Sequence, residues 1–320
     1  MIRLAWGVVV VSLAACGGSS SGSIDAIADS GQSDGGVDAV IDGAVVDGAV
    51  PDAGPDAPPP VDAILGCVTA PPYTAPTPAS VSIPAADLAL WLRADLGVSL
   101  DDTSRVCEID DLSGAGHDFR QLTAGSRPAM DVLGGQPALA VTGTQYLQHD
   151  GVLGIDGASA RTIVIVVQLD ATAARSTFFF QGQAGTGGTY LGPEANTFST
   201  TGSRWGAYFT NNAYDTGLAT STGATVYVWA TDSMTAGQPI LSHLTVRANG
   251  AAQTLTRTAG GTGNTNIESF AGATYTWIGS GATAGADFQM AEALVWSRAL
   301  SGVELGQVET YLMGRYGITP

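Results

Sequence analysis

The chain has 320 residues and a formal charge of −17, and charged side chains make up only 13% of it. Every fixed positive charge is an arginine, because no lysine occurs. Phosphate binding needs clustered cations, so this composition excludes nucleic acid as a partner. The 43 glycines, together with abundant Ser, Thr and Ala, favour many strands joined by tight turns.

Residues 1–16 are expected to form a signal peptide. A basic start at Arg3 precedes an apolar run that is too short to span a membrane. The tetrad that ends in Cys16 resembles the lipobox of bacterial lipoproteins, in which the cysteine is lipidated and becomes the mature N-terminus. This resemblance implies an anchor in outer-membrane lipid through Cys16, hence a place in the cell envelope, on its periplasmic or its exterior side. An ordinary signal peptide with a chance cysteine is the alternative.

Residues 17–79 are expected to be a disordered tether. Nine aspartates and no cation lie between Gly17 and Gly66, among alanine, glycine and proline. Like charges and a low content of large apolar residues predict disorder. The aspartate spacing matches neither the EF-hand loop nor the calcium-binding nonapeptide repeat, so a solvated spacer is the better interpretation.

Cys67 and Cys107 are the two thiols that remain if Cys16 is lipidated. In an oxidising compartment, two cysteines most simply form one disulfide. A metal site is disfavoured because no histidine or third thiol lies at ligand spacing. The pairing would fix the end of the tether to the first strands of the globular domain.

The globular domain is expected over residues 80–320. Alternating or β-branched segments predict its strands. The segment 161–169 is an almost unbroken β-branched run, which predicts a strand buried on both faces. Strands are expected at 88–95, twice within 107–122, and at 137–148, 161–169, 176–182, 204–210, 225–232, 240–248, 251–258 and 274–281.

The end of the chain, from Asp287 to Gly317, predicts one long strand followed by one amphipathic helix. Alternation puts two sets of strand residues on opposite faces: Phe288, Met290, Leu294 and Trp296 against Ala291, Ala293 and Val295. Ser301 and Glu304 form a capping box that starts the helix, and Gly317 supplies its left-handed end. The expected apolar face of the helix consists of Val303, Val308, Tyr311, Leu312 and Tyr316.

Ten or more strands and one helix predict an all-β fold, a two-sheet antiparallel jelly-roll sandwich with one short C-terminal helix. Four stretches occur in a familiar order: Leu90–Asp95, Asp111–Phe119, Val141–Leu147, and Ala291–Ser301 with its continuation to Gly317. Over residues 85–318 this set resembles the bacterial concanavalin A-like lectin/glucanase superfamily, in its laminin-G-like branch. Ile109 stands where relatives often carry tryptophan. The resemblance implies a non-catalytic recognition domain with a glycan ligand. An envelope protein as partner is the alternative, and a glycoside hydrolase is third.

The hydrolase hypothesis depends on paired carboxylates. Relatives that cleave β-glucans carry Glu-x-Asp-x-x-Glu on one strand, and Glu108-Ile109-Asp110 resembles its start. The third acid would stand at position 113, where this chain has Ser113. No catalytic residue is therefore assigned.

Glu292 lies on the predicted closing strand, so its carboxylate is expected to be partly buried and to need a partner. A ligand-facing acid and a structural acid are both possible roles. The structural role is preferred, because no second acid is identifiably nearby.

Sugar sites combine an aromatic platform with amide or carboxylate partners. Such a mixture occurs in the stretch 204–215, whose candidate ligand-binding residues are Trp205, Tyr208, Asn211, Asn212 and Tyr214. Packing of Trp205 and Tyr208 into the sandwich core is the alternative, and the more common fate of aromatic residues. By the resemblance, the sandwich rim could also hold a structural calcium, with Asp118, Asp150 and Asp156 as oxygen donors. No other cofactor is expected.

Overall fold

The computed structural model of the chain describes residues 66–156, 159–170, 176–182, 190–195, 204–209, 212–232, 240–259, 274–279 and 286–320. These residues belong to one compact unit, Asp56–Pro320. Residues 1–65, with Cys16 and most of the expected tether, lie outside them. Within the described part, no helix has the length and apolar character needed to cross a membrane.

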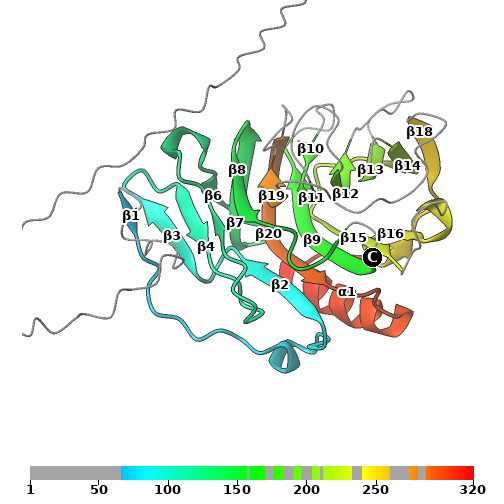
Figure 1. Ribbon diagram of the computed structural model, residues 1–320, viewed down its shortest axis with the longest axis horizontal. Coiled ribbons are helices and arrows are strands. Elements are labelled where there is room, and N and C mark those ends of the chain that lie inside the picture. Colours follow the sequence, from blue (N-terminus) through cyan, green and yellow to red (C-terminus); the bar gives the residue numbers. More distant parts are fainter. Residues whose placement is uncertain are drawn as a thin grey trace, which may run out of the picture. The chain divides into compact units, whose positions relative to one another are not determined.

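The described strands form two antiparallel sheets, as the sequence predicts (Figure 1). The first sheet has twelve strands, and its order from edge to edge is β1-β3-β4-β5-β8-β19-β11-β12-β13-β14-β18, with β10 also pairing with β12. Its strands are β1 Cys67–Val68, β3 Val98–Asp101, β4 Val106–Ile109, β5 Phe119–Arg120, β8 Tyr146–Asp150, β10 Ser176–Thr177, β11 Phe179–Gly182, β12 Tyr190–Ala195, β13 Arg204–Phe209, β14 Asn212–Ala219, β18 Thr256–Ala259 and β19 Tyr275–Gly279.

The second sheet has eight described strands in the order β17-β16-β15-β9-β20-β7-β6, and β2 also pairs with β20. Its strands are β2 Leu88–Arg93, β6 Ala129–Leu133, β7 Gln136–Gly143, β9 Arg161–Leu169, β15 Thr225–Thr231, β16 Leu244–Ala248, β17 Ala251–Ala252 and β20 Ala286–Trp296. β9 and β20 lie at its centre, which explains why residues 161–169 are apolar on both faces.

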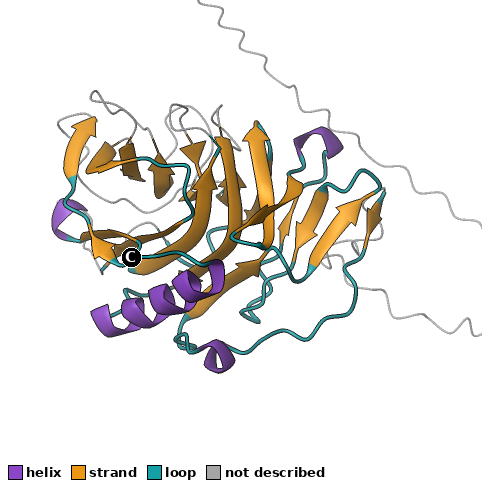
Figure 2. Ribbon diagram, turned by 180° about the vertical axis from the view of Figure 1, so that it is seen from behind, coloured by secondary structure: helices purple, strands orange, loops and turns teal. Residues whose placement is uncertain are grey.

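The main hydrophobic core lies between the two sheets. Alternate residues of the first sheet, such as Phe119 and Ile278, pack there against residues of the second, such as Ile165 and Phe288. A second core lies on the other face of the eight-stranded sheet, where α1 (Gly302–Tyr316) covers Trp91, Val164 and neighbouring residues. In Figure 2 the helix lies across the strands of this sheet. The eight-stranded sheet is thus covered on both faces.

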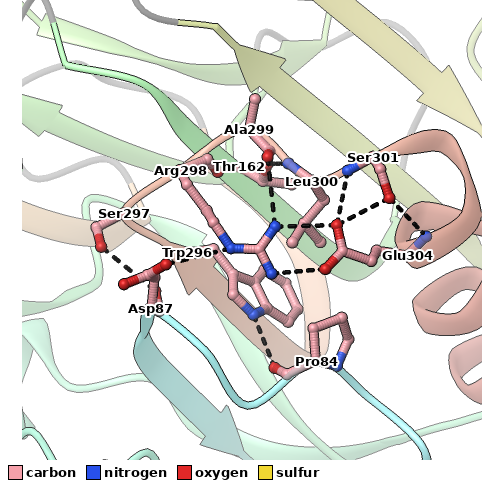
Figure 3. A network of polar contacts seen from close by, with 10 residues as sticks. All are labelled: Pro84, Asp87, Thr162, Trp296, Ser297, Arg298, Ala299, Leu300, Ser301 and Glu304. Carbon is pink, nitrogen blue, oxygen red and sulfur yellow. Dashed lines mark hydrogen bonds and ion pairs between the residues drawn. The ribbon is translucent and has the colours of Figure 1, made fainter.

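The capping box at the start of α1 is confirmed. The Ser301 hydroxyl accepts a hydrogen bond from the Glu304 backbone N–H, and the Glu304 carboxylate accepts one from the Ser301 N–H. Arg298 adds two donors to the same carboxylate, at 2.7 and 2.9 Å (Figure 3). The hydrogen bonds from Arg298 and Ser301 lower the pKa of Glu304 to about 2. At the other end, Gly317 ends the helix in the left-handed conformation, as predicted.

Hydrogen bonds to distant strands hold the turn between β20 and α1 (Figure 3). The Thr162 hydroxyl, from β9, donates to the Arg298 carbonyl at 2.9 Å and accepts from the Leu300 N–H at 3.0 Å. The Trp296 indole N–H donates to the Pro84 carbonyl at 2.9 Å. These contacts fix the direction in which the helix leaves the sheet.

A β-bulge in β20 corrects the predicted faces of this strand. Alternation placed Met290 and Leu294 together, but the register against β9 shifts between Met290 and Glu292. An extra residue at a bulge reverses the side-chain parity beyond it. The residues of β20 in the inter-sheet core are Phe288, Met290, Ala293 and Val295, and those beneath the helix are Ala291, Leu294 and Trp296.

The predicted apolar face of α1 also needs a correction. Val303 is 75% exposed, and Leu305 lies in the second core in its place. At 3.6 residues per turn, Val303 lies on the opposite side of the helix from Leu305, Val308 and Leu312, which explains its exposure. Val308, Leu312 and Tyr316 are buried as predicted.

The sequence pattern misses five described strands, β1, β3, β6, β12 and β14, and extends one segment too far. Ile240–Ser242 forms a 3₁₀ helix before β16, where a strand was predicted. The predicted disulfide between Cys67 and Cys107 is confirmed. It joins β1, at the edge of the twelve-stranded sheet, to β4.

Candidate functional site

A row of five residues crosses the face of the twelve-stranded sheet that points away from the core. The inter-sheet core contains Ile109, Phe119, Leu147, Ile278 and Phe179, so their neighbours along each strand point to the opposite face. Pairing between strands puts those neighbours side by side, in the order Glu108, Arg120, Gln148, Trp277 and Phe180. Residues that are distant in the sequence thus meet on one face of the sheet, where Arg120 and Gln148 are partly exposed and Glu108, Trp277 and Phe180 are buried.

Contacts between side chains order this row. The Arg120 Nε donates to Glu108 Oε1 at 2.6 Å. The Trp277 indole N–H donates to Gln148 Oε1 at 3.3 Å, and the ring of Phe180 lies 4.7 Å from that of Trp277. Gln148 in turn donates to Asp150 Oδ1 at 3.1 Å. The amide and the carboxylate are therefore oriented before any ligand arrives.

A pocket of about 520 Å³ opens over β5 and β8, a volume typical of small-ligand sites. We call it the β5–β8 pocket. The described residues that line it are Gly116, Asp118, Arg120, Gln121, Leu122, Thr123, Tyr146, Gln148, His149 and Asp150. It combines a phenol ring, an imidazole, amides, carboxylates and a guanidinium.

The loop between β4 and β5 brings Asp118 to this pocket. Asp111 accepts hydrogen bonds from the backbone N–H groups of Trp91, Ser113 and His117 at 2.9 to 3.1 Å. The Asp118 carboxylate accepts from the Asp111 N–H at 2.9 Å. Side chains that accept from nearby backbone groups stabilise such turns. The loop is therefore a fixed part of the pocket wall.

Titratable groups with shifted pKa values gather around the pocket. Glu108 is 1% exposed, and burial raises its pKa although Arg120 opposes the shift. Within the described part of the chain, its Oε2 atom has no hydrogen-bond partner. Burial also raises the pKa of Asp110, whose Oδ2 accepts from the Tyr73 hydroxyl at 2.9 Å. Shifted pKa values of this kind often mark functional sites.

His149 lines the pocket, and its ring packs against that of His117. The ring centroids of His117 and His149 are 4.9 Å apart, and His149 also stacks on Phe119. The His149 Nδ1–H donates a hydrogen bond to the Asp118 carbonyl oxygen at 3.2 Å. Burial lowers the pKa of His149, and the neighbouring His117 adds to the shift. Burial therefore favours the neutral form of the ring.

The aromatic platform predicted in the stretch 204–215 is wrong for two of its residues. Trp205 and Tyr214 are 1% and 2% exposed and belong to the inter-sheet core, where Trp205 stacks on Tyr227. Their positions in β13 and β14 point them inward. Tyr208 and Asn212 lie in the same two strands, paired with Ala213 and Phe209. Asn211 lies outside the described residues.

The incomplete glucanase motif is part of this surface but carries no third acid. Glu108 and Asp110 lie on β4 and just after it, while the Ser113 hydroxyl donates to Asp111 in the following turn. Asp118 and Asp150, two of the three suggested calcium donors, line the β5–β8 pocket, and Asp156 does not. In the described ranges, no three His, Cys, Asp or Glu side chains come together to hold a metal ion.

The structural role preferred for Glu292 is confirmed. Its carboxylate is fully buried and accepts hydrogen bonds from the Trp91 indole N–H and from the hydroxyls of Tyr311 and Tyr316. Burial raises its pKa, and the hydrogen bonds from Trp91 and Tyr316 oppose the shift. These donors come from β2 and α1, so Glu292 joins the helix to the sheet.

The sequence prediction missed Arg120, Tyr146, Gln148 and His149 as site residues. A local signal was present, because Tyr146, Gln148 and Asp150 alternate with the core residue Leu147 in a polar-out pattern. The same pattern is typical of any strand with one solvated face. Only the pairing of β8 with β5 and β19 makes this face a site.

No protein-family model matches the chain, and no curated protein matches it. Among solved structures, a sialidase from Trypanosoma rangeli is 16% identical, with a TM-score of 0.49 over 80% of this chain and 37% of that one. The same sialidase in complex with the inhibitor DANA is 15% identical, with a TM-score of 0.48 over 71% and 33%. A GH54 α-L-arabinofuranosidase is 17% identical, with a TM-score of 0.44 over 77% and 61%. The chain thus spans about a third of the length of the sialidases it resembles, and no activity is transferred from any of these enzymes.

Proposed function

We propose that this protein is a non-catalytic carbohydrate-binding protein whose ligand occupies the β5–β8 pocket. One observation supports this most strongly: the half-buried ring of Tyr146 lines the same pocket as the pre-oriented side chains of Gln148 and Asp150. An aromatic face stacks on the apolar face of a sugar ring, and amide and carboxylate oxygens accept from its hydroxyls. The jelly-roll sandwich holds these groups on a rigid sheet.

Glycan binding by the full chain tests the proposal. We expect an array of neutral and charged glycans to yield at least one ligand, and Tyr146→Ala to weaken its binding about tenfold or more, as truncation of an aromatic anchor does. Val303→Ala is the control, because Val303 is an exposed side chain of α1 that does not line the pocket. Absence of any glycan ligand, or equal binding by the Tyr146→Ala variant, would overturn the proposal.

A protein partner in the cell envelope is the second candidate, favoured by Leu122 at the pocket rim. This side chain is 70% exposed, and exposed apolar side chains contribute to protein interfaces. Leu122→Asp would then weaken the interaction with a protein but leave glycan binding nearly unchanged. Hydrolysis of a bound glycan, abolished by Glu108→Gln, would instead revive the glycoside hydrolase hypothesis.

The proposed location is the cell envelope, with the domain tethered to outer-membrane lipid through Cys16. The lipobox resemblance of residues 13–16 and the acidic, proline-containing stretch that follows support it. We expect Cys16→Ala to move the chain from the membrane fraction to the soluble fraction. Retention of that variant in the membrane fraction would contradict the lipid anchor.

A further inference from the structure

Carboxylates outnumber cations around the β5–β8 pocket. Asp118 and Asp150 line it, and Arg120 is the one arginine among its described lining residues. Glu108 lies beside Arg120 in the cross-strand row, with Asp110 two residues further along the chain. No lysine occurs in the chain to balance these acids. The local field therefore has the same sign as the whole-chain charge of −17.

Arg120 is already paired with carboxylates. Its Nε donates to Glu108 Oε1 at 2.6 Å, and its Nη2 lies 3.8 Å from Asp118 Oδ2. A guanidinium that faces two carboxylates has little positive potential left for a third. An acidic saccharide in the pocket would meet Asp118 and Asp150 without an unpaired cation among the described lining residues.

The carboxylate oxygens around the pocket are hydrogen-bond acceptors. Asp150 is exposed, and Gln148 donates only to its Oδ1 atom among the described contacts, which leaves Oδ2 for a ligand. Glu108 is 1% exposed and does not line the pocket, so its carboxylate adds negative charge beside Arg120 but no acceptor for a ligand. Sugar hydroxyls and ammonium groups donate hydrogen bonds, whereas sugar carboxylates only accept them. The pocket therefore complements donors.

We infer that the β5–β8 pocket selects saccharides that carry no acid group and rejects acidic ones. The inference rests on the proposed function, since it names the ligand class of the same pocket. Asp118 and Asp150 attract donating hydroxyl or ammonium groups, and they repel a uronate or a sialate. Glu108 contributes to this selection indirectly, because its carboxylate pairs with the Arg120 guanidinium and so reduces the positive potential that an acidic ligand would meet.

Binding of four oligosaccharide probes to the full chain tests the inference. The probes are an oligoglucose, an oligoglucosamine and an oligogalacturonate of equal length, together with sialyllactose. At about 20 mM salt we expect the two non-acidic probes to bind about tenfold or more tighter than the two acidic ones. About 200 mM salt should reduce the difference, because it screens charges at the surface.

Two variants separate charge selection from general damage to the fold. Glu108→Gln keeps the shape of the side chain but frees Arg120, so binding of the oligogalacturonate should become about threefold or more tighter. Asp150→Asn changes an exposed residue and should raise the affinity for acidic probes in the same direction. Asp102→Asn, at an exposed aspartate that does not line the pocket, is the matched control and should change neither.

The outcomes distinguish this inference from the proposed function. If the acidic probes bind as tightly as the others or tighter, charge selection is wrong while carbohydrate binding stands. If the two pocket variants leave the ratio between probes unchanged, the named carboxylates are not the selecting groups and the inference fails. If none of the probes binds and the wider glycan array also yields no ligand, the proposed function falls, and this inference falls with it.

Discussion

Replacing Glu292 by alanine would remove the acceptor that joins α1 to the sheet. Trp91 Nε1 donates to its Oε1 atom at 2.7 Å, Tyr316 OH to its Oε2 atom at 2.9 Å, and Tyr311 OH to Oε1 at 3.1 Å. The side chain of Glu292 is 0% exposed. Alanine would leave these donors without a partner and would remove one of the two carboxylates near Arg315, whose Nε lies 3.6 Å from Glu292 and whose Nη2 pairs with Asp95.

The expected loss in free energy of unfolding is about 3–5 kcal/mol, the range for removal of one partner from a buried charged network. Each orphaned buried donor costs about 1–3 kcal/mol, so three of them account for a loss of this size, even though Tyr311 can recover part of its loss from water. In a domain of this size, about 4 kcal/mol lowers the Tm by about 8–16 °C. The variant should still fold, because domains are stable by about 5–15 kcal/mol.

Urea unfolding followed by tryptophan fluorescence measures this loss. Glu292→Gln keeps the shape and one acceptor, so it should lose only about 1–3 kcal/mol. Gln307→Ala, at an exposed position of the same helix, is the control and should change stability by less than about 0.5 kcal/mol. A Glu292→Ala variant within about 1 kcal/mol of the wild type would refute the assignment of Glu292 as the joint between helix and sheet.

The pH dependence of the stability difference between the wild type and Glu292→Gln tests the direction of the pKa shift of Glu292. Burial raises the pKa of Glu292 above that of the unfolded chain. Its contribution to stability is therefore complete below about pH 4.3, the unfolded value, and is lost as the pH rises through the folded pKa. Glutamine cannot ionise, so the stability advantage of the wild type over Glu292→Gln should shrink as the pH rises. A growing advantage would contradict the direction of the shift.

Three further predictions concern the disulfide, a turn and a histidine. Replacing Cys67 and Cys107 by serine opens a loop of 40 residues and should cost about 4 kcal/mol in the chain-entropy model, measured by urea unfolding. Gly134→Ala should lower the Tm more than Gly135→Ala. Both glycines have a positive φ, but only at Gly134 would the new Cβ clash with the last helical carbonyl of α1. Equal decreases in Tm would contradict this close approach. Burial lowers the pKa of His149, so the contribution of this residue to stability is present above the unfolded pKa of about 6.5 and is lost as the pH falls through the folded pKa. The stability of the wild type relative to His149→Gln should therefore fall on acidification. A rise would refute this direction of the pKa shift.

Local chemistry explains why much of the fold could be predicted. The capping box of Ser301 and Glu304 lies within four residues, and its hydrogen bonds need no other part of the chain. The β-branched run at 161–169 forms β9 as expected, because a strand with two apolar faces is stable only at the centre of a covered sheet. The disulfide between Cys67 and Cys107 was predictable from the thiol count and the expected compartment.

The candidate site could not be predicted in the same way. Trp205 and Tyr214 were candidate binding residues, with packing into the core as the alternative for Trp205; both lie in the core, while Tyr146 and Asp150 line the pocket. Alternation divides a strand into two faces but does not say which face a second sheet will cover. That choice depends on the strand pairing.

The sequence by itself determined most of the strands and the helix with its two ends, because hydrogen-bonding partners and side-chain periods within a few residues decide them. The disulfide followed from the thiol count. Tertiary structure alone decided that Glu108, Arg120, Gln148 and Trp277 form one row. It also placed the bulge at Met290, which turns Leu294 and Trp296 toward the helix. Both outcomes depend on the register between paired strands whose partner residues lie far apart in the chain, by 129 positions for Gln148 and Trp277, and no local pattern encodes that register.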